Sequence, residues 1–419
     1  MTRIVLDQAI EAAPARVVLT RDAAGAVTQA SFDMSGLPRV DAALIGRRVT
    51  EVPDLVARLC GICPSAHHLA GMRALEALAA VDPPPTADAV RRLLHYAGVI
   101  SIHVVGMVAT LPDEALLLRR FAKAVTAATG SPGHFPVTAV PGGVIAPVGE
   151  KDRDAALALA GDALAAARRV AEQALARPAR PDGFSGADVA LIDKAGCLDL
   201  FGWTLRAVAA DGTVLIPAGT TAEWDALVSE ADPGSSAPKP YLVPLGASRG
   251  AYRVGPVAQL RVGPVPTPVA GELQVAWRQG PGGASGARAI ILVHVVEMIT
   301  ALLESTETAG EITTPWPDEL PAGVGIGWVD GARGLLVHRY VAAPDGRVAD
   351  ATILTPTAQN EPWLDGLLRA AGPPAGDAGN MGLEDAIREA DPCLPCSSVP
   401  PGTMDLVVEV VPAEPHEEV

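Results

Sequence analysis

The sequence predicts an α+β fold in which a large buried helical bundle carries peripheral β-hairpins. Three observations support this prediction: helical periodicity between residues 52 and 129, alternating segments joined by turn residues near both ends of the chain, and a hydrophobic fraction of 49%. Because aromatic residues make up only 4% of the chain, the core must be built mainly from alanine, valine and leucine. A chain of 419 residues is long enough for one large fold with a deep interior.

The first half of the chain is expected to form a hairpin followed by helices. Two short alternating segments within residues 17–34 flank a turn at 22–25, a pattern typical of a β-hairpin. In residues 52–129, apolar side chains surround the predicted helix axes almost completely, which indicates buried helices. The alanine-rich segment 154–176 has its charged residues on one face, so we expect a helix on the surface of the bundle.

The second half is expected to be more irregular. Residues 183–268 are rich in glycine and proline, which favours irregular structure and short strands, whereas 289–303 returns to a helical pattern. Residues 335–354 predict a second hairpin with its turn at 344–346. Since no repeat or long linker is evident, we expect one domain over 1–419, with a hairpin region (1–50), a helical core (51–180), an irregular region and helix (181–330), and a C-terminal part (331–419).

Charge and hydropathy argue against two kinds of partner. A formal net charge of −16 disfavours nucleic acid, because phosphate binding requires clustered lysine and arginine. No apolar run approaches the roughly 18 residues of a membrane helix, and the best run, 289–296, is much shorter. The N-terminal segment lacks a basic region followed by a long apolar stretch. We therefore expect a soluble cytoplasmic protein without membrane insertion.

Four of the five cysteines form two Cys-x-x-Cys pairs, Cys60/Cys63 and Cys393/Cys396. Together the pairs offer four thiolates, a set that selects soft transition metals. Zinc ribbons separate their pairs by roughly 15–20 residues, whereas almost the entire chain lies between these two. A single pair is often a redox dithiol or half of a zinc site, but two pairs so far apart indicate a buried metal site between the two ends of the fold. Cys197 stands alone and is expected to be a small core residue.

The segments around both pairs resemble the signature motifs of nickel–iron hydrogenase large subunits. The first runs from Arg58 to His67 as RLCGICPSAH, and the second runs from Asp391 to Cys396 as DPCLPC. The resemblance covers most of the chain, and the wording is most similar to the cytoplasmic, bidirectional group that is coupled to NAD(P). Further matching positions are Asp41 to Arg47 with Pro53, Tyr252 to Pro256, Arg333 and Gly334 with His338, and Pro356 and Thr357 with Asn360.

This resemblance implies a fold like that of the hydrogenase large subunits and a nickel–iron centre held by four thiolates. Cys60 and Cys393 would be terminal ligands of nickel, while Cys63 and Cys396 would bridge nickel to an iron that carries carbon monoxide and cyanide. The implied reaction is reversible heterolytic cleavage of H2. Because no cysteines are left for a cluster in this chain, electrons are expected to pass to an iron–sulfur small subunit, then through diaphorase-type subunits to a soluble acceptor such as NAD(P).

The resemblance also assigns side chains around the metals. Arg333 would lie over the open metal position, and Thr357 would donate its hydroxyl to a cyanide. Asp113 and Asp391 would orient that arginine, and His67 would donate a hydrogen bond to a bridging sulfur. Taken singly, each of these residues is more often an ordinary turn or salt-bridge residue, and it is their joint occurrence in the family's order that favours the functional interpretation.

The sequence departs from the family pattern at three places. Val399 stands where the family has the histidine or arginine at which a maturation protease cuts, and Asp41 replaces a glutamate that binds magnesium. Glu11 matches the proton-relay glutamate only if an extra residue is allowed before Ala15. We therefore expect the C-terminal segment to be retained, with residues 404–410 forming a strand beside the first hairpin, and the magnesium site to be empty or filled with water.

Two alternatives to an enzyme remain open from the sequence. The chain would be a metal-bearing subunit without turnover if it served as a hydrogen sensor, or as a structural or proton-relay component of a larger redox complex. The changes at Asp41 and Val399 favour that alternative, and the intact cysteines and Arg333 oppose it. A zinc-stabilised scaffold is the weaker alternative, because zinc requires none of the matches around the cysteines.

Overall fold

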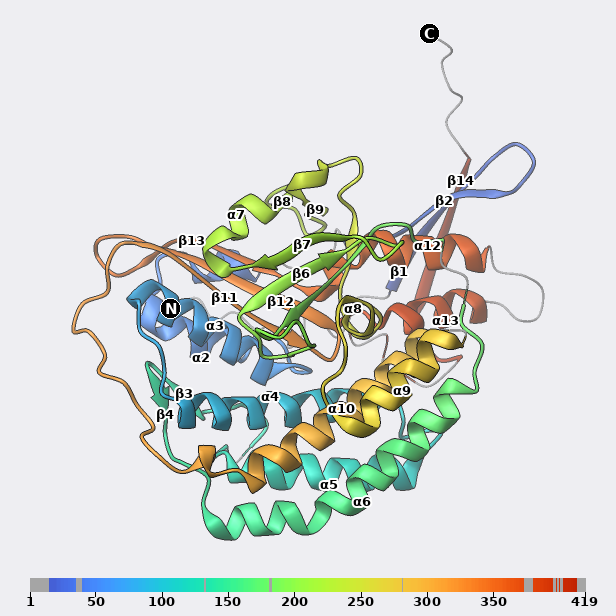
Figure 1. Ribbon diagram of the computed structural model, residues 1–419. Helices are drawn as coiled ribbons and strands as arrows, with labels where there is room; N and C mark the ends of the chain where they lie inside the picture. Colours follow the sequence, from blue (N-terminus) through green and yellow to red (C-terminus); the bar gives the residue numbers. More distant parts are fainter. Residues whose placement is uncertain are drawn as a thin grey trace.

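The protein is described here by a computed structural model, in which residues 15–34, 40–131, 133–180, 183–280, 282–372, 380–394, 397, 399 and 402–412 are placed (Figure 1). In the view of Figure 1, long helices fill the lower half of the molecule and the strands lie above them. The sulfur atoms of the two ends of the chain meet between these layers, as described below.

Four long helices pack against one another and form the helical layer: α4 (Pro85–Val105), α5 (Pro112–Ala128), α6 (Glu150–Leu175) and α10 (Ala284–Glu304). Helix α6 turns a row of buried alanines to its neighbours, and such small side chains allow close packing. Each of α4 and α5 begins with a proline in its first turn, where the missing N–H costs nothing. The helical predictions for 52–129, 154–176 and 289–303 are thus confirmed.

Helix α10 is apolar on all sides and forms the centre of this layer. It is the one helix in the described part of the chain that is long and apolar enough to cross a membrane. However, 72% of its most apolar window is buried inside the protein, and the core helix of a folded domain meets the same criterion.

A three-stranded antiparallel sheet of β11 (Gly323–Gly331), β12 (Gly334–Ala342) and β13 (Val348–Leu354) lies next to helix α3 (Pro64–Ala79). The helix packs directly on β11, where a side chain at Gly327 would collide with the backbone of Ala70 and Ala74. This close approach brings the N-terminus of α3 next to the turn between β11 and β12. The predicted hairpin over 335–354 is confirmed as β12 and β13.

A second sheet has the strand order β10-β5-β6-β7. The region 183–268 therefore contains more regular structure than the sequence suggested. Strand β5 is buried along its whole length, so its sequence shows no alternation that would mark it as a strand. The elements of this region are β5 (Ala187–Ile192), β6 (Thr204–Val208), β7 (Val214–Gly219), α7 (Trp224–Leu227), β8 (Val228–Glu230), β9 (Pro240–Leu242), β10 (Tyr252–Arg253) and α8 (Pro256–Val262).

The third sheet joins the two ends of the chain. Strand β1 (Ala15–Arg21) pairs antiparallel with β2 (Val27–Phe32), and it pairs parallel with β14 (Leu406–Pro412) over seven residue pairs, from Ala15 with Leu406 to Arg21 with Pro412. Figure 1 shows this sheet at the upper right, with the blue and red strands side by side. Both the first hairpin and the strand expected at 404–410 are confirmed.

The other elements are short or follow the long ones. Helices α9, α12 and α13 and strand β11 are additional to the elements predicted from the sequence. The bounds of these other elements are η1 (Asp41–Leu44), η2 (Val49–Glu51), α2 (Val52–Val56), β3 (Ala139–Val140), β4 (Gly143–Val144), η3 (Thr221–Glu223), η4 (Val243–Leu245), α9 (Pro268–Gln279), η5 (Thr306–Thr308), α11 (Pro356–Gln359), α12 (Glu361–Ala371) and α13 (Met381–Ala390).

Candidate metal centre

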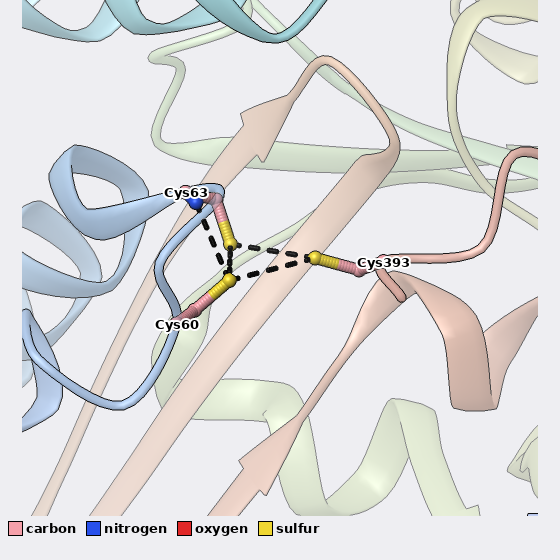
Figure 2. A group of neighbouring side chains, drawn as sticks. All are labelled: Cys60, Cys63 and Cys393. Atoms are coloured by element: carbon pink, nitrogen blue, oxygen red, sulfur yellow. Dashed lines mark hydrogen bonds between the residues drawn. The ribbon is translucent and has the colours of Figure 1, made fainter. Parts of the chain in front are cut away.

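Three cysteine sulfurs from opposite ends of the chain meet in the interior (Figure 2). Cys60 and Cys63 lie on the loop between α2 and α3, and Cys393 follows α13. The Sγ atom of Cys63 lies 2.8 Å from that of Cys60 and 3.4 Å from that of Cys393, and the Sγ atoms of Cys60 and Cys393 are 3.8 Å apart. All three are free thiols. The fourth expected ligand, Cys396, lies outside the described residues.

Local structure turns these sulfurs toward one another. Cys63 is the N-cap of α3, Pro64 occupies the first turn, and the N–H of Cys63 donates to the Sγ of Cys60 over 3.3 Å. The partial positive charge at a helix N-terminus favours thiolates. On the other side, α13 ends at Asp391, which adopts a left-handed conformation with φ 48°, and Pro392 prevents the helix from continuing.

The electrostatics of the cluster call for added positive charge. Hydrogen bonds with the thiols of Cys393 and Cys63 lower the pKa of Cys60 to about 3. Hydrogen bonds with the neighbouring thiols and burial raise the pKa of Cys63, and hydrogen bonding to Cys60 with burial raises the pKa of Cys393 to about 11. Three sulfurs this close cannot all ionise in an apolar interior unless a cation compensates them. The donor set therefore fits a soft metal ion.

Arg333 is fixed beside the sulfurs by three hydrogen bonds. Its Nε donates to the backbone oxygen of Asp391 and its Nη2 to the Oδ1 of Asp391, each over 3.1 Å, while its Nη1 lies 3.9 Å from the Sγ of Cys393. The side chain is only 6% exposed. Burial alone would lower the pKa of Arg333, but Asp391 and the cysteines outweigh it and raise the pKa. A permanent positive charge thus faces the cluster, held by a planar fork.

The turn that carries Arg333 is locked by close backbone packing. Gly334 has a φ of 125°, a conformation that a side chain would strain, and an added Cβ there would lie 2.7 Å from the backbone nitrogen of Gly255. The segment around Gly255 is held in turn by Asn360, whose Oδ1 accepts a hydrogen bond from the N–H of Val254. The position of the guanidinium is therefore set by the scaffold.

Thr357 contacts the cluster through the backbone. Its Oγ1 accepts a hydrogen bond from the N–H of Cys393 over 2.7 Å, and the residue is 7% exposed. This bond holds the Cys393 loop against α11. Because the oxygen accepts, the hydroxyl proton of Thr357 is left to donate to another group.

A small cavity of about 40 Å³ adjoins the sulfurs. Cys63, Cys393 and Arg333 supply its polar wall, and the rest of its wall is largely apolar, with Val99, Ile102, Leu336 and Pro356 among the lining residues. A space of this size holds little more than one water molecule. It suits small uncharged or diatomic species beside a metal.

His67 also lines this cavity, and it begins a buried chain of hydrogen bonds. Its Nδ1 lies 3.0 Å from the Nε2 of His338, whose Nδ1 contacts the hydroxyl of Tyr340. Burial lowers the pKa of His67 to about 4 and lowers that of His338 further below its usual range. Sequence reasoning assigns no role to His338 or Tyr340. The available signal is their His-x-Tyr spacing, which puts both side chains on one face of a strand.

Asp113 does not join the candidate centre. It is exposed in the first turn of α5, and the hydrogen bonds of Arg333 in the described part of the chain go to Asp391 and Cys393. The sequence expectation that Asp113 orients the arginine is therefore corrected. A match in spacing was misleading, because the largely exposed connection between α4 and α5 keeps this carboxylate at the surface. Glu11, the expected relay carboxylate, lies outside the described residues.

The residues expected at the magnesium position offer a poor ligand set. Asp41 is buried in η1, where its Oδ1 accepts from the N–H of Ala42, and the side chain of Val399 has no donor atom at all. The backbone oxygen of Val399 accepts from the Nη2 of Arg388 over 3.1 Å. Magnesium requires near-octahedral oxygen coordination, and these groups do not provide it.

Comparison with known proteins supports the metal interpretation. Residues 40–108, which include the first cysteine pair, match the family model described as nickel-dependent hydrogenase. A subunit of the vhu F420-non-reducing hydrogenase of Methanocaldococcus jannaschii is 27% identical over 398 residues, covering 85% of this chain and 95% of that protein. The beta subunit of the NAD-reducing hydrogenase HoxS of Cupriavidus necator is 27% identical over 435 residues, covering 88% of each chain.

Solved structures share the fold. An NAD+-reducing NiFe hydrogenase in the H2-reduced state superimposes with a TM-score of 0.80 at 27% identity, covering 90% of this chain and 95% of that one. A NiFeSe hydrogenase variant from Desulfovibrio vulgaris Hildenborough gives a TM-score of 0.69 at 18% identity, over 89% of this chain and 94% of that one. The second likeness concerns the fold alone.

Proposed function

Since this chain belongs to the nickel-dependent hydrogenases and has the fold of their large subunits, we propose that it is the catalytic subunit of a nickel–iron hydrogenase that cleaves H2 heterolytically and reversibly. The observation that carries the proposal is the meeting of Cys60, Cys63 and Cys393 under the guanidinium of Arg333. These thiolates, together with Cys396, would hold the metals. When bound, the nickel–iron pair supplies the soft Lewis-acidic site at which H2 is polarised.

The residues around the sulfurs have separate tasks in this proposal. Arg333 keeps a positive charge next to the Cys393 sulfur and stabilises negative charge that develops there, while Asp391 fixes its orientation. The apolar cavity excludes bulk water and leaves room for the carbon monoxide and cyanide proposed as ligands of iron. Thr357 has a hydroxyl proton to donate to a cyanide. Glu11 stays a proposed proton-relay residue.

Electrons must leave through a partner. The chain has five cysteines, four of which belong to the proposed centre, so it has no ligands for an iron–sulfur cluster of its own. We therefore propose that the direct partner is an iron–sulfur small subunit, and that diaphorase-type subunits pass the electrons to NAD(P). The likeness to the beta subunit of the NAD-reducing hydrogenase HoxS supports this choice. A cytoplasmic location and the absence of nucleic-acid binding complete the proposal.

Hydrogen isotope exchange tests the proposed reaction without knowledge of the electron acceptor. The purified native complex is incubated with D2 in ordinary water, and the gas phase is followed by mass spectrometry. Heterolytic cleavage is expected to produce HD and then H2, because the proton partner exchanges with solvent. A metal-loaded complex that releases no HD would contradict the catalytic proposal.

A non-turnover subunit is the second candidate, as a hydrogen sensor or as a structural or proton-relay component. The poor ligand set at Asp41 and Val399 favours it, since that region departs most from the family pattern. Both candidates require the same metals. The exchange rate separates them, because a sensor is expected to bind H2 with exchange far slower than in an enzyme.

The C-terminal segment is held to the body of the protein by side chains as well as by β14. The Oε2 of Glu384 accepts from the N–H of Gly402 over 2.8 Å and pairs with Arg388, which in turn donates to the oxygen of Val399. Met404 is 7% exposed and belongs to the main hydrophobic core. Loss of this segment would uncover the edge of β1 and part of that core.

We predict that the protein is used with this segment attached. Val399 offers neither the charge nor the metal-binding nitrogen of the residue that normally directs cleavage, and removal would expose apolar surface. Intact mass spectrometry of the protein from its native complex is expected to give the full chain, 42.9 kDa, apart from changes at the N-terminus. A chain that ends at or near Val399 would show that proteolysis occurs despite the substitution.

A further inference from the structure

Three buried side chains form a continuous hydrogen-bonded chain that ends at the candidate metal centre. His67 on α3 contacts His338 on β12 over 3.0 Å, and His338 contacts Tyr340 on the same strand. His67 is 5% exposed, and His338 and Tyr340 are fully buried. Because solvent is excluded, the direction of each hydrogen bond is decided by the members of the chain alone.

The shape of the packing is specific for this chain. His67 and Gly71 lie one turn apart on α3, and His338 and Tyr340 lie two residues apart on β12, so both pairs face each other. A Cβ atom on Gly71 would lie 3.0 Å from the hydroxyl oxygen of Tyr340. The glycine therefore leaves the space that the phenol occupies.

The phenol sets the direction of the hydrogen bonds. Burial raises the pKa of Tyr340, so the hydroxyl stays protonated, and His338 is the partner that the described residues give it. If Tyr340 donates to the Nδ1 of His338, the proton of that ring is on Nε2 and is donated to the Nδ1 of His67. In the opposite direction the hydroxyl proton would have no acceptor in a fully buried site, which is unfavourable.

We infer that Tyr340 and His338 are positioning residues that hold His67 as the tautomer with its proton on Nε2. This inference rests on the proposed function only for its purpose, which is to present an N–H donor to the cavity that contains Cys63 and Cys393. With Nδ1 occupied by His338, Nε2 is the ring nitrogen left for that cavity. The opposite tautomer would present a lone pair to electron-rich sulfurs and would repel them.

The direct test is Tyr340→Phe in the full-length metal-free protein labelled with 15N-histidine. The 15N shifts of the two ring nitrogens report the tautomer of His67, and the signals are assigned by their loss in His67→Gln. In the unchanged protein, Nδ1 is expected to be unprotonated. In Tyr340→Phe, removal of the hydrogen bond that sets the direction is expected to move the ratio of the two tautomers by roughly five- to tenfold.

Matched variants separate this role from general destabilisation. Tyr252→Phe also removes a buried hydroxyl, which donates to Gln359 over 3.1 Å, and is expected to leave the His67 shifts unchanged. His338→Gln supplies an amide N–H to His67 that does not depend on Tyr340, so adding Tyr340→Phe to it is expected to have no further effect on the tautomer.

Unchanged His67 shifts in Tyr340→Phe would overturn the inference, and so would a shift of equal size in Tyr252→Phe. In the metal-loaded complex, Tyr340→Phe is expected to retain its metals but to shift the infrared bands of their ligands and to slow isotope exchange severalfold. A protein without nickel and iron would refute the proposed function, whereas the tautomer measurement on the metal-free chain would still decide this inference.

Discussion

Replacing Cys393 with serine is expected to abolish nickel retention and to reduce hydrogen turnover to background. A serine hydroxyl is a hard ligand that remains protonated at neutral pH, so it cannot replace a thiolate on a soft metal. Cys393 is also the residue that joins the C-terminal part of the chain to Cys60 and Cys63, with its sulfur 3.8 Å and 3.4 Å from theirs. Its loss breaks the connection between the two ends of the fold.

The same result is expected for Cys60→Ser, and metal analysis with the isotope-exchange assay measures both variants. Cys197→Ser is the matched control, because Cys197 is a half-buried free thiol outside the cluster and should retain metals and activity. Full activity in Cys60→Ser or Cys393→Ser would refute the ligand assignment. A loss of metal in Cys197→Ser would mean that serine substitution itself disturbs the fold.

Arg333→Lys is expected to keep its metals and to lose roughly 10²- to 10³-fold in rate, the scale seen when one preorganised donor is removed from an active site. Lysine keeps the charge but has no planar fork, so it cannot contact the backbone oxygen and carboxylate of Asp391 and the sulfur of Cys393 together. The charge would therefore move away from the position that the turn at Gly334 enforces.

Arg339→Lys is the control for this variant. Arg339 lies on β12 as well, but its side chain pairs with the exposed carboxylates of Asp225 and Asp350 and should be replaceable without effect on rate. Nickel and iron content, measured beside the exchange rate, distinguishes the outcomes. A loss of metal from Arg333→Lys would show that the arginine is structural, and an unchanged rate would remove it from the proposed mechanism.

The features that the sequence predicts correctly are those with a strong local signal. The helices of 52–129 and 289–303 are apolar on nearly all sides, and both hairpins have clear turn residues. The meeting of the two cysteine pairs followed from chemistry, because two thiolates are too few for a site that requires four. The strand at the C-terminal end was visible in its β-branched residues, and its position beside β1 is confirmed.

The features that the sequence missed depend on contacts between distant segments. Strand β11 is rich in glycine because α3 packs directly on it, and glycine in isolation disfavours a strand. Asp113 was placed by its spacing to neighbouring motifs, whereas the pairing of Arg333 with Asp391 depends on the left-handed turn after α13. The link from His67 to His338 joins α3 to β12, and no local pattern predicts such a pairing.

The central claim is that this chain holds a nickel–iron pair, and the most direct test is elemental analysis combined with infrared spectroscopy of the native complex. One nickel and one iron per chain are expected, with bands from carbon monoxide and cyanide bound to iron. Both signals would follow from a cluster whose three described sulfurs lie within 4.8 Å of one another. Zinc in place of nickel and iron, with no such bands, would contradict this claim.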